Sequence, residues 1–438
     1  MGKSLSLRVQ GTAVNAVLSG KKTPGLSRKE LDSAARGCMA KFDRGRWLLI
    51  RLIETLFAPV VRGLDRLQFA RRTETKEIRR ILVIECGQFG DIALLSAFLR
   101  SLRMHYKEAR IALAADPKVF PLVKNEDFVD ELIPVRAPWG PDFPCWRKYN
   151  PFSADWMRFG STVHGLRRQS FDLAFCAKAD IRDNFFVWLS GARRRIGYGF
   201  YGGSCFLTDV APPDLDHPHY SRRWLSLLEY LGKPIMDPRT RLSLYPTEEK
   251  FAEEYLAEKG VKNGDFIVGI HPGARVRVRQ WGKENFRAVG EGLAAQFAVK
   301  ILWFEEPNPR SPSEVSRNFI SVSLPLREFM GVLSRCNLLI CNDSGPLHIA
   351  ESLGVPVVAL FGPNMPAWFG PIGEQSVTIL EDGFWCRPCG DHCIFDQPYC
   401  LRTISVNRVL RATVESVLNL ASKFDAEIQG RKKVEAIP

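Results

Sequence analysis

Asp343, Ser344 and Pro346 stand together in the segment NDSGPLHIAESLGVPVVALFGP, residues 342–363, between two apolar runs of strand length. Asp343 or Ser344 suits the N-cap of a helix, and Pro346 suits its first turn. Backbone N–H groups at a helix start, together with the helix dipole, can bind an anion such as phosphate. The segment therefore predicts a strand, a helix and a strand, with either a phosphate site or an ordinary capped turn at the helix start.

A second aspartate, Asp91, ends the loop CGQFGD, residues 86–91. An apolar strand at 81–84 precedes the loop, and a helix of about residues 91–106 follows it. Such a loop lies at the carboxyl end of a strand, where open α/β sheets bind their ligands. The loop lacks both the three-glycine dinucleotide fingerprint and the Gly-Lys-Ser/Thr of a P-loop. What remains is a carboxylate at a helix start, which either serves a site or caps the helix.

Strand and helix patterns continue along the chain and predict two α/β domains. Residues 171–199 have the pattern of a strand, a turn, a helix and a strand. In residues 265–304 a strand runs into His-Pro-Gly-Ala at 271–274, and a basic loop, a helix and another strand follow. The tract 211–250 has the proline and charge density of a connection between domains. A chain of 438 residues is long enough for two such domains and an appendage.

The positive charge is concentrated at the amino-terminal end. The chain has a net charge of +13, and residues 1–80 contain 18 Lys and Arg against 7 Asp and Glu. The rest of the chain is therefore nearly neutral, which argues against a nucleic-acid partner for its body.

Within this basic leader, residues 46–70 have the pattern of an amphipathic helix, and residues 1–30 show no secretory signal. The apolar stripe consists of Leu49, Ile53, Leu56, Val60, Leu64 and Leu67. Pro59 is expected to kink or split the helix. Charged residues interrupt it too often for a membrane span, so we predict that it lies in an anionic membrane surface. The alternative is a helix packed on the protein's own core.

Four of the 11 cysteines lie in the run CRPCGDHCIFDQPYC. They are Cys386, Cys389, Cys393 and Cys400. Their spacing is compatible with a structural zinc, with a redox pair or with reduced thiols that pack in the fold. The odd total and the scattered single cysteines favour a reducing compartment.

Three of these segments together resemble the heptosyltransferases of glycosyltransferase family 9. They are the Gly-Asp loop at 90–91, the loop from HPGA to RQW at 271–281, and the segment 342–363. The runs LSGARRRIGYG and Gly370-Pro371 fit the same family. The resemblance covers about residues 79–415 and leaves the leader outside.

The resemblance implies a GT-B architecture, in which two Rossmann-like domains face a central cleft. Residues 78–245 would then form the acceptor domain and residues 262–425 the nucleotide-sugar domain, after an extension of residues 1–77. It further implies an inverting, metal-independent transfer of heptose from an ADP-linked donor to the lipopolysaccharide inner core, with no required cofactor. A lipid-linked acceptor predicts a cytoplasmic protein on the inner face of the cytoplasmic membrane.

The resemblance also assigns roles to residues. Asp91 would be the general base that takes the proton of the acceptor hydroxyl. Arg279 stands where the family commonly has a lysine, two positions before Trp281, and Lys283 is a second candidate cation. Either Glu305 or Glu314 would contact the donor ribose. The donor-binding residues that it implies are His271, Gly273, Arg279, Lys283, Glu314, Asp343, Ser344, Gly345, Leu347 and His348.

Two hypotheses for the function remain open at this point. The first is an active glycosyltransferase of the cell envelope, and the second is a non-catalytic sugar-nucleotide or glycan-binding protein that keeps the fold. The presence of both Asp91 and the helix start at 343–348 favours the enzyme. The run ECGQF before Gly90 departs from the basic or serine-containing run that is usual there, so the acceptor is left open.

Overall fold

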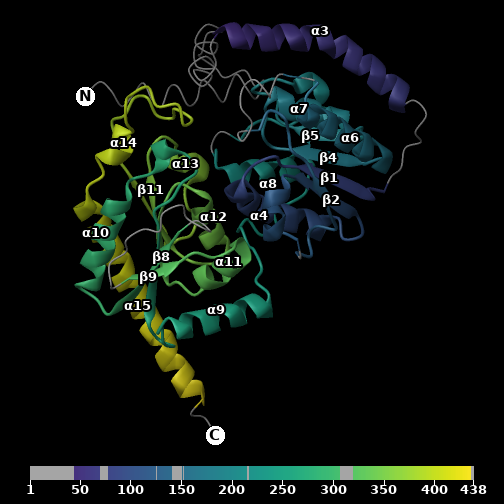
Figure 1. Ribbon diagram of the computed structural model, residues 1–438. Coiled ribbons are helices and arrows are strands. Elements are labelled where there is room, and N and C mark those ends of the chain that lie inside the picture. Colours follow the sequence, from purple (N-terminus) through teal and green to yellow (C-terminus); the bar gives the residue numbers. More distant parts are fainter. Residues whose placement is uncertain are drawn as a thin grey trace, which may run out of the picture. The chain divides into compact units, whose positions relative to one another are not determined.

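The computed structural model describes residues 44–69, 77–124, 126–140, 150, 152–214, 217–305 and 319–435 (Figure 1). The chain forms two compact units. The first consists of Met1–Gly87, Phe98–Pro117 and Asp127–Pro238, and the second of Gln88–Ala97, Lys118–Glu126 and Arg239–Pro438.

The first unit is built on a sheet of six parallel strands in the order β3-β2-β1-β4-β5-β6. The strands are β1 Arg80–Ile84, β2 Arg110–Ala115, β3 Glu131–Pro134, β4 Leu173–Cys176, β5 Arg194–Gly197 and β6 Asp209–Val210. The runs in β1, β2 and β4 are almost wholly apolar and buried, as expected for parallel strands with both faces covered. This strand order is that of the Rossmann fold.

Helices and short 3-10 turns alternate with these strands along the chain. They are α4 Phe89–His105, η1 Pro117–Leu122, α6 Ala154–Gln169, α7 Ile181–Leu189, η2 Ser204–Phe206 and α8 Tyr220–Tyr230. The start of α4 and most of η1 are grouped with the second unit. Ser153 caps α6 by accepting from the Trp156 N–H, and Asp180 caps α7 by accepting from the Arg182 N–H. The core on one side of the sheet includes Phe159 and Phe186, whose ring centroids are 4.9 Å apart.

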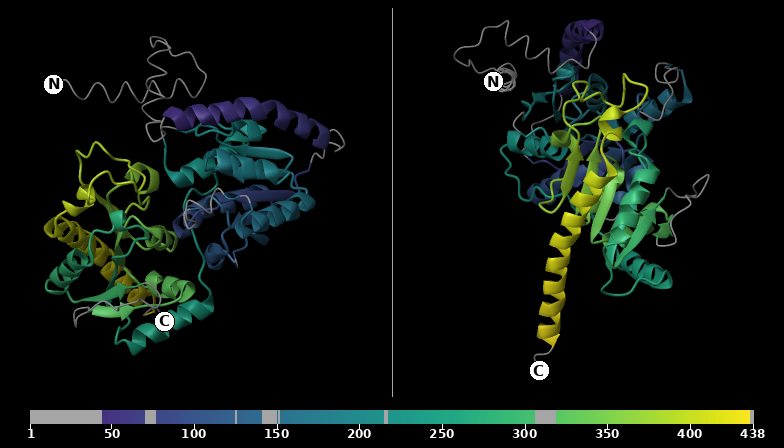
Figure 2. Two further views of the ribbon diagram at one scale, coloured as in Figure 1. Left: turned by 45° about the horizontal axis from the view of Figure 1, so that its top comes forward. Right: turned by 90° about the vertical axis from the view of Figure 1, so that its left-hand side faces the viewer.

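The leader contributes one long helix, α3 Arg44–Phe69, which lies along the first unit (Figures 1 and 2). Pro59 does not split this helix, which is continuous through that position, and a kink there stays a prediction. Proline removes the N–H that would bond the carbonyl of Thr55. Both residues are exposed, so water can solvate that carbonyl.

The second unit repeats the architecture with a sheet of six parallel strands in the order β12-β11-β10-β7-β8-β9. The strands are β7 Phe266–His271, β8 Val299–Phe304, β9 Phe319–Val322, β10 Leu338–Asn342, β11 Val357–Phe361 and β12 Val377–Leu380. Numbered from β7, this is the strand order of the first sheet, so the chain contains two Rossmann-like units, as predicted.

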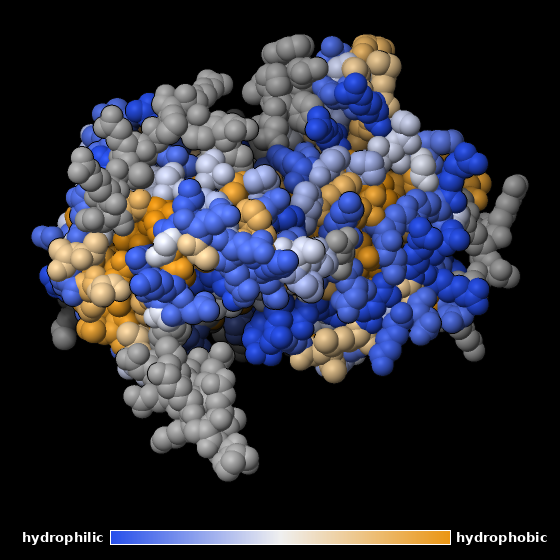
Figure 3. Space-filling view, turned by 60° about the horizontal axis from the view of Figure 1, so that its bottom comes forward, coloured by the Kyte–Doolittle hydropathy of each residue, from blue (hydrophilic) through white to orange (hydrophobic). Residues whose placement is uncertain are grey.

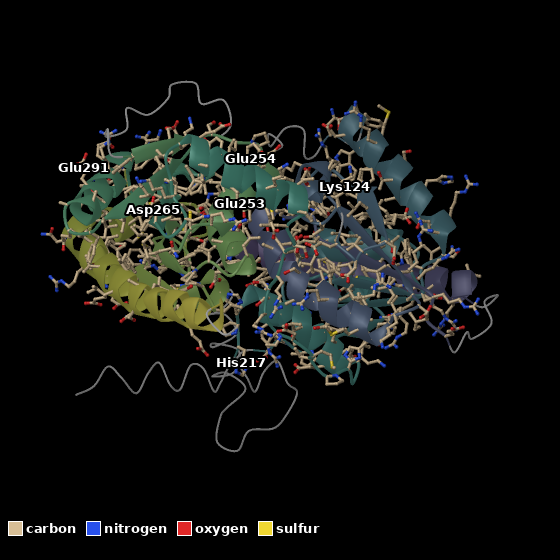
Figure 4. The ribbon with its side chains drawn as sticks, turned by 90° about the horizontal axis from the view of Figure 1, so that it is seen from below. Lys124, His217, Glu253, Glu254, Asp265 and Glu291 are labelled. Atoms are coloured by element: carbon tan, nitrogen blue, oxygen red, sulfur yellow. The ribbon has the colours of Figure 1, made fainter. Side chains whose placement is uncertain are left out.

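Helices again alternate with the strands of this sheet along the chain. They are α9 Pro246–Glu258, η3 Arg277–Arg279, α10 Lys283–Ala294, α11 Leu326–Ser334, α12 Gly345–Ser352, α13 Pro366–Phe369, α14 Tyr399–Arg402 and α15 Val406–Glu435. Trp281, Trp303 and Phe286 fill the centre of the core. Glu253 and Glu254, labelled in Figure 4, stand on the exposed side of α9, where Glu253 pairs with Arg335 at 2.7 Å.

Figure 3 shows a mostly hydrophilic face on which hydrophobic residues form separate patches, as is usual for folded proteins. No helix within the described part of the chain is long and apolar enough to cross a bilayer.

Candidate functional site

The turn between β10 and α12 has the predicted strand-to-helix form. Ser344 occupies the N-cap, yet its hydroxyl donates to the Asn342 carbonyl at 3.2 Å and does not cap the first N–H groups of α12. Pro346 lies in the first turn, as predicted, and the Leu347 N–H donates to the Ser344 carbonyl at 3.1 Å. Of the residues expected to offer N–H groups to a diphosphate, Leu347 thus has an acceptor within the turn.

Asp343 does not point away from the protein at this turn. Its side chain is almost fully buried, accepts from Asn364 Nδ2 at 2.6 Å and lies 3.4 Å from Nη1 of Arg279. Burial raises the pKa of Asp343, and the charge of Arg279 and the Asn364 hydrogen bond act against that rise. In this arrangement Asp343 holds Arg279, and a direct contact of Asp343 with the donor stays a prediction.

Arg279 ends η3 and is held between two carboxylates. Its Nε and Nη2 donate to Oδ1 and Oδ2 of Asp391 at 2.6 and 2.7 Å, and Nη1 faces Asp343. Burial works to lower the pKa of Arg279, but the hydrogen bonds to Asp391 and the charges of both aspartates outweigh it and raise that pKa. The guanidinium is therefore a permanent cation whose forked donors are occupied by a side chain of the protein.

Asp391 could not be predicted from the sequence, because this residue contacts Arg279 across 112 positions of the chain. Asp391 lies in the cysteine-rich run and adopts a left-handed conformation with φ +72°, which aspartate tolerates better than most residues. Nearby in sequence, Arg387 Nε donates to the Gly362 carbonyl at 2.6 Å. The cysteine-rich run is thus fixed at one point to the loop after β11 and at another to Arg279.

The four cysteines of this run do not fit a metal ion. Among the residues that the structure describes, no three His, Cys, Asp or Glu side chains form a group suited to a metal. The Cys393 thiol donates to the Gln397 carbonyl at 3.6 Å, and burial raises the pKa of Cys389 and of Cys400. The structural zinc considered from the spacing is therefore not supported, and no step is derived through it.

The loop after β7 is joined to the same place by Asn342, a second residue that the sequence did not single out. Its Nδ2 donates to the Pro272 carbonyl at 2.8 Å, and its Oδ1 accepts from the Trp281 N–H at 3.1 Å. One amide at the end of β10 thereby ties together the HPGA and RQW segments. The sequence signal that could have identified Asn342 is an amide side chain at the carboxyl end of an apolar strand.

His271 ends β7, and burial lowers its pKa to about 4. Its imidazole is therefore neutral near neutral pH in this structure and can form hydrogen bonds. Gly273 follows closely, where a Cβ would lie 3.1 Å from Cε1 of His271, so a larger residue would crowd the ring. Lys283 begins α10 with an exposed side chain. Glu314 lies outside the described residues, and Glu305 directly follows β8.

Asp91 is the third residue of α4, after the strand β1. Its Oδ2 accepts from the Gln88 N–H at 2.6 Å, which is how an acidic residue in a first helical turn satisfies the chain before it. The side chain is half-buried. The structure thus gives Asp91 a capping contact and leaves its role as a general base as a prediction.

Beside this loop, the end of β1 carries a fully buried carboxylate that the sequence did not indicate. Glu85 pairs with Lys178 Nζ at 2.9 Å and accepts from the Tyr220 hydroxyl at 2.7 Å. Asp183 on α7 accepts from Trp139 Nε1 at 3.3 Å, and burial raises the pKa of Asp183. Polar groups therefore gather inside the first unit at the carboxyl ends of β1 and β4, where α/β folds bind ligands.

Comparisons with known proteins agree with this architecture. Lipooligosaccharide heptosyltransferase 2 of Haemophilus influenzae is 22% identical over 316 residues, which are 68% of this chain and 88% of that protein. Lipopolysaccharide heptosyltransferase 2 of Salmonella typhimurium is 22% identical over 329 residues, with 68% and 87% covered.

Among solved structures, a family 9 glycosyltransferase from Veillonella parvula has a TM-score of 0.64 at 22% identity, and the match covers 80% of this chain and 100% of that one. The ADP-heptose lipopolysaccharide heptosyltransferase II of Escherichia coli has a TM-score of 0.59 at 19% identity, over 78% and 99% of the two chains. Residues 159–398, more than half of the sequence, match the family model of glycosyltransferase family 9 (heptosyltransferase). The chain therefore belongs to glycosyltransferase family 9.

Proposed function

We propose that this glycosyltransferase moves a heptose, with inversion and without a metal, from an ADP-linked donor to a lipopolysaccharide core or a related envelope glycan. The observation that carries the proposal is the meeting of three segments at the carboxyl edge of the second sheet, where Asn342 joins the HPGA and RQW segments and Asp343 contacts Arg279. Similar folds include a heptosyltransferase, WaaC of E. coli, solved with ADP and with ADP-2-deoxy-2-fluoro heptose.

The chemistry that this edge could supply is stabilisation of a leaving diphosphate. The departing group gains negative charge as the glycosidic bond breaks, and a fixed cation and helix N–H groups can stabilise that charge. Arg279 is such a cation, and α12 begins beside its partner Asp343. Because Asp391 occupies two guanidinium donors, a diphosphate must share or displace this carboxylate.

Inversion requires an acceptor hydroxyl that attacks the anomeric carbon while it loses its proton to a base. Asp91 is the proposed base, because it is a half-buried carboxylate at the carboxyl end of a central strand. The acceptor is proposed to be lipid-linked, which would place the enzyme peripherally on the cytoplasmic face of the membrane.

The test is an assay of purified protein with ADP-heptose and a lipopolysaccharide core acceptor, read by ADP release and by mass spectrometry of the acceptor. Transfer that fails in Asp91→Asn but not in the exposed control Asp127→Asn supports the enzyme. Tight binding of ADP-heptose without any transfer, to any core acceptor, would instead support the non-catalytic binding protein.

A further inference from the structure

The helix α3 turns most of its large apolar side chains away from the unit on which it packs. Eight large apolar residues of the helix are exposed, and their exposed fractions run from 46% for Leu64 to 75% for Leu67. They are Leu48, Leu49, Leu52, Leu56, Phe57, Val60, Leu64 and Leu67. A helix on a soluble protein usually buries such a stripe against the core, so this arrangement is inverted.

The opposite side of α3 faces the first unit with acidic groups. Glu54 Oε1 accepts from the N–H and the hydroxyl of Ser204 at 2.9 and 3.0 Å. Asp65 accepts from Trp188 Nε1 at 3.2 Å and pairs with Arg195. Val61, on the same side, is only 1% exposed.

These contacts fix the rotation of the helix about its axis. Arg195 is almost fully buried and also donates to the carbonyls of Phe206 and Ala192 at 2.8 and 3.1 Å. A buried guanidinium needs a carboxylate partner, and Asp65 supplies it. If α3 rolled to bury its leucines, Arg195 would lose that partner, so the apolar side stays outward.

Basic residues accompany the outward side. Arg51, Arg62 and Arg66 are exposed on α3, and Arg51 lies 3.7 Å from Glu54. An apolar stripe flanked by arginines is complementary to a membrane surface, where the apolar side chains reach the acyl boundary and the arginines meet anionic headgroups.

We infer that α3 is an in-plane membrane helix: its leucine side enters an anionic phospholipid surface while Glu54 and Asp65 keep it attached to the first unit. The inference rests on the proposed function only for its purpose, which is to bring the enzyme to a lipid-linked acceptor. The binding of lipid follows from the helix itself.

The experiment is co-sedimentation of the full chain with vesicles of phosphatidylglycerol and phosphatidylethanolamine, and with neutral phosphatidylcholine vesicles. We expect binding to the anionic vesicles that weakens, but persists, as salt rises. The double variant Leu52→Ser and Leu56→Ser should reduce the partition coefficient by at least about 10-fold. The reason is that two leucine side chains no longer contribute their favourable transfer from water into the membrane. Both residues are exposed, so circular dichroism and the melting temperature should be unchanged.

The matched control is Met157→Ser, which removes another large, 64% exposed apolar side chain of the first unit. It should sediment like the wild type. Equal sedimentation of the wild type and the double variant overturns the inference. So does a dimer in light scattering that the double variant dissociates without any loss of vesicle binding, because the stripe would then pair two copies.

A third readout separates this inference from the proposed function. Transfer to a delipidated core acceptor should be equal in the wild type and the double variant. Normal transfer without vesicle binding refutes the membrane helix alone, whereas vesicle binding without transfer by the wild type refutes the proposed function alone.

Discussion

The two hydrogen bonds from Arg279 to Asp391 lead to a prediction about the affinity for the donor, in which the direction of the change decides between two roles of Asp391. If a donor diphosphate binds Arg279, it competes with a carboxylate that already receives two hydrogen bonds from the guanidinium. Asp391→Asn removes the negative charge and leaves a neutral amide of the same shape. We therefore expect this variant to bind ADP and ADP-heptose more tightly than the wild type.

The structure sets the size of the effect. A hydrogen bond to a charged group contributes about 1.5–3 kcal/mol. The two side chains are 23% and 18% exposed, so solvent screens the pair in part. Asparagine also keeps one acceptor for Arg279. A gain near the lower limit, about 1.4 kcal/mol, corresponds to a Kd about tenfold lower.

Isothermal titration calorimetry with ADP measures this Kd directly. Asp396→Asn is the matched control, because it removes one negative charge from an exposed position of the same cysteine-rich run and should leave the Kd unchanged. A weaker Kd in Asp391→Asn would refute the competition and show that Asp391 orients Arg279 for the donor. An unchanged Kd in both Asp391→Asn and Arg279→Ala would place the diphosphate away from this arginine.

Three further expectations concern Asp91, Asp65 and His271. Asp91→Asn should reduce turnover by about 100-fold or more while the Kd for ADP-heptose stays the same; near-normal turnover in a coupled ADP-release assay would leave Asp91 with its capping contact alone. Asp65→Asn leaves the buried Arg195 without its carboxylate and should lower the free energy of unfolding by about 3 kcal/mol in urea titrations, whereas Glu77→Gln, at a 68% exposed side chain, should not. In the folded protein the pKa of His271 is about 4, below its ordinary value of 6.5. As the pH falls from 6.5 to 4 the unfolded state is protonated first, so the free energy of unfolding falls by up to about 1.4 kcal/mol per pH unit. Urea titrations at pH 7 and 5 should show this loss in the wild type and not in His271→Gln.

The sequence sufficed for the elements whose signal is local. Strands such as β1 and β10 are continuous apolar runs, and the turn after β10 places proline where a helix begins, so their positions could be predicted. The pairing of Arg279 with Asp391 could not, because it joins segments 112 residues apart and depends on how the cysteine-rich run folds back. That run attracted attention for its four cysteines, which follow one another at short intervals compatible with a metal, whereas a single aspartate among them forms no pattern.

The helix α3 illustrates a different limit. Periodicity separates its apolar side from its polar side, but it does not say which side faces the protein. A hydrophobic stripe is usually assigned to the core, and here two acidic residues replace it. The orientation depends on Arg195, a buried residue far along the chain. Because Arg195 pairs with Asp65, the side of α3 that carries Asp65 faces the protein and the leucines face outward.

The same logic of a buried arginine applies in both units, with different consequences. Arg195 is 1% exposed, so its carboxylate partner is structural, and exchange with a ligand would require α3 to leave. Arg279 retains 23% exposure and has two carboxylate partners, Asp343 being almost fully buried and Asp391 only partly so. Loss of Asp391 would leave Arg279 still paired with Asp343, so the guanidinium would not become an uncompensated buried charge. A ligand phosphate can therefore replace Asp391 at a far smaller energetic cost than it could replace Asp65, and this difference in burial is the physical reason to place an exchangeable anion at Arg279 and a permanent one at Arg195.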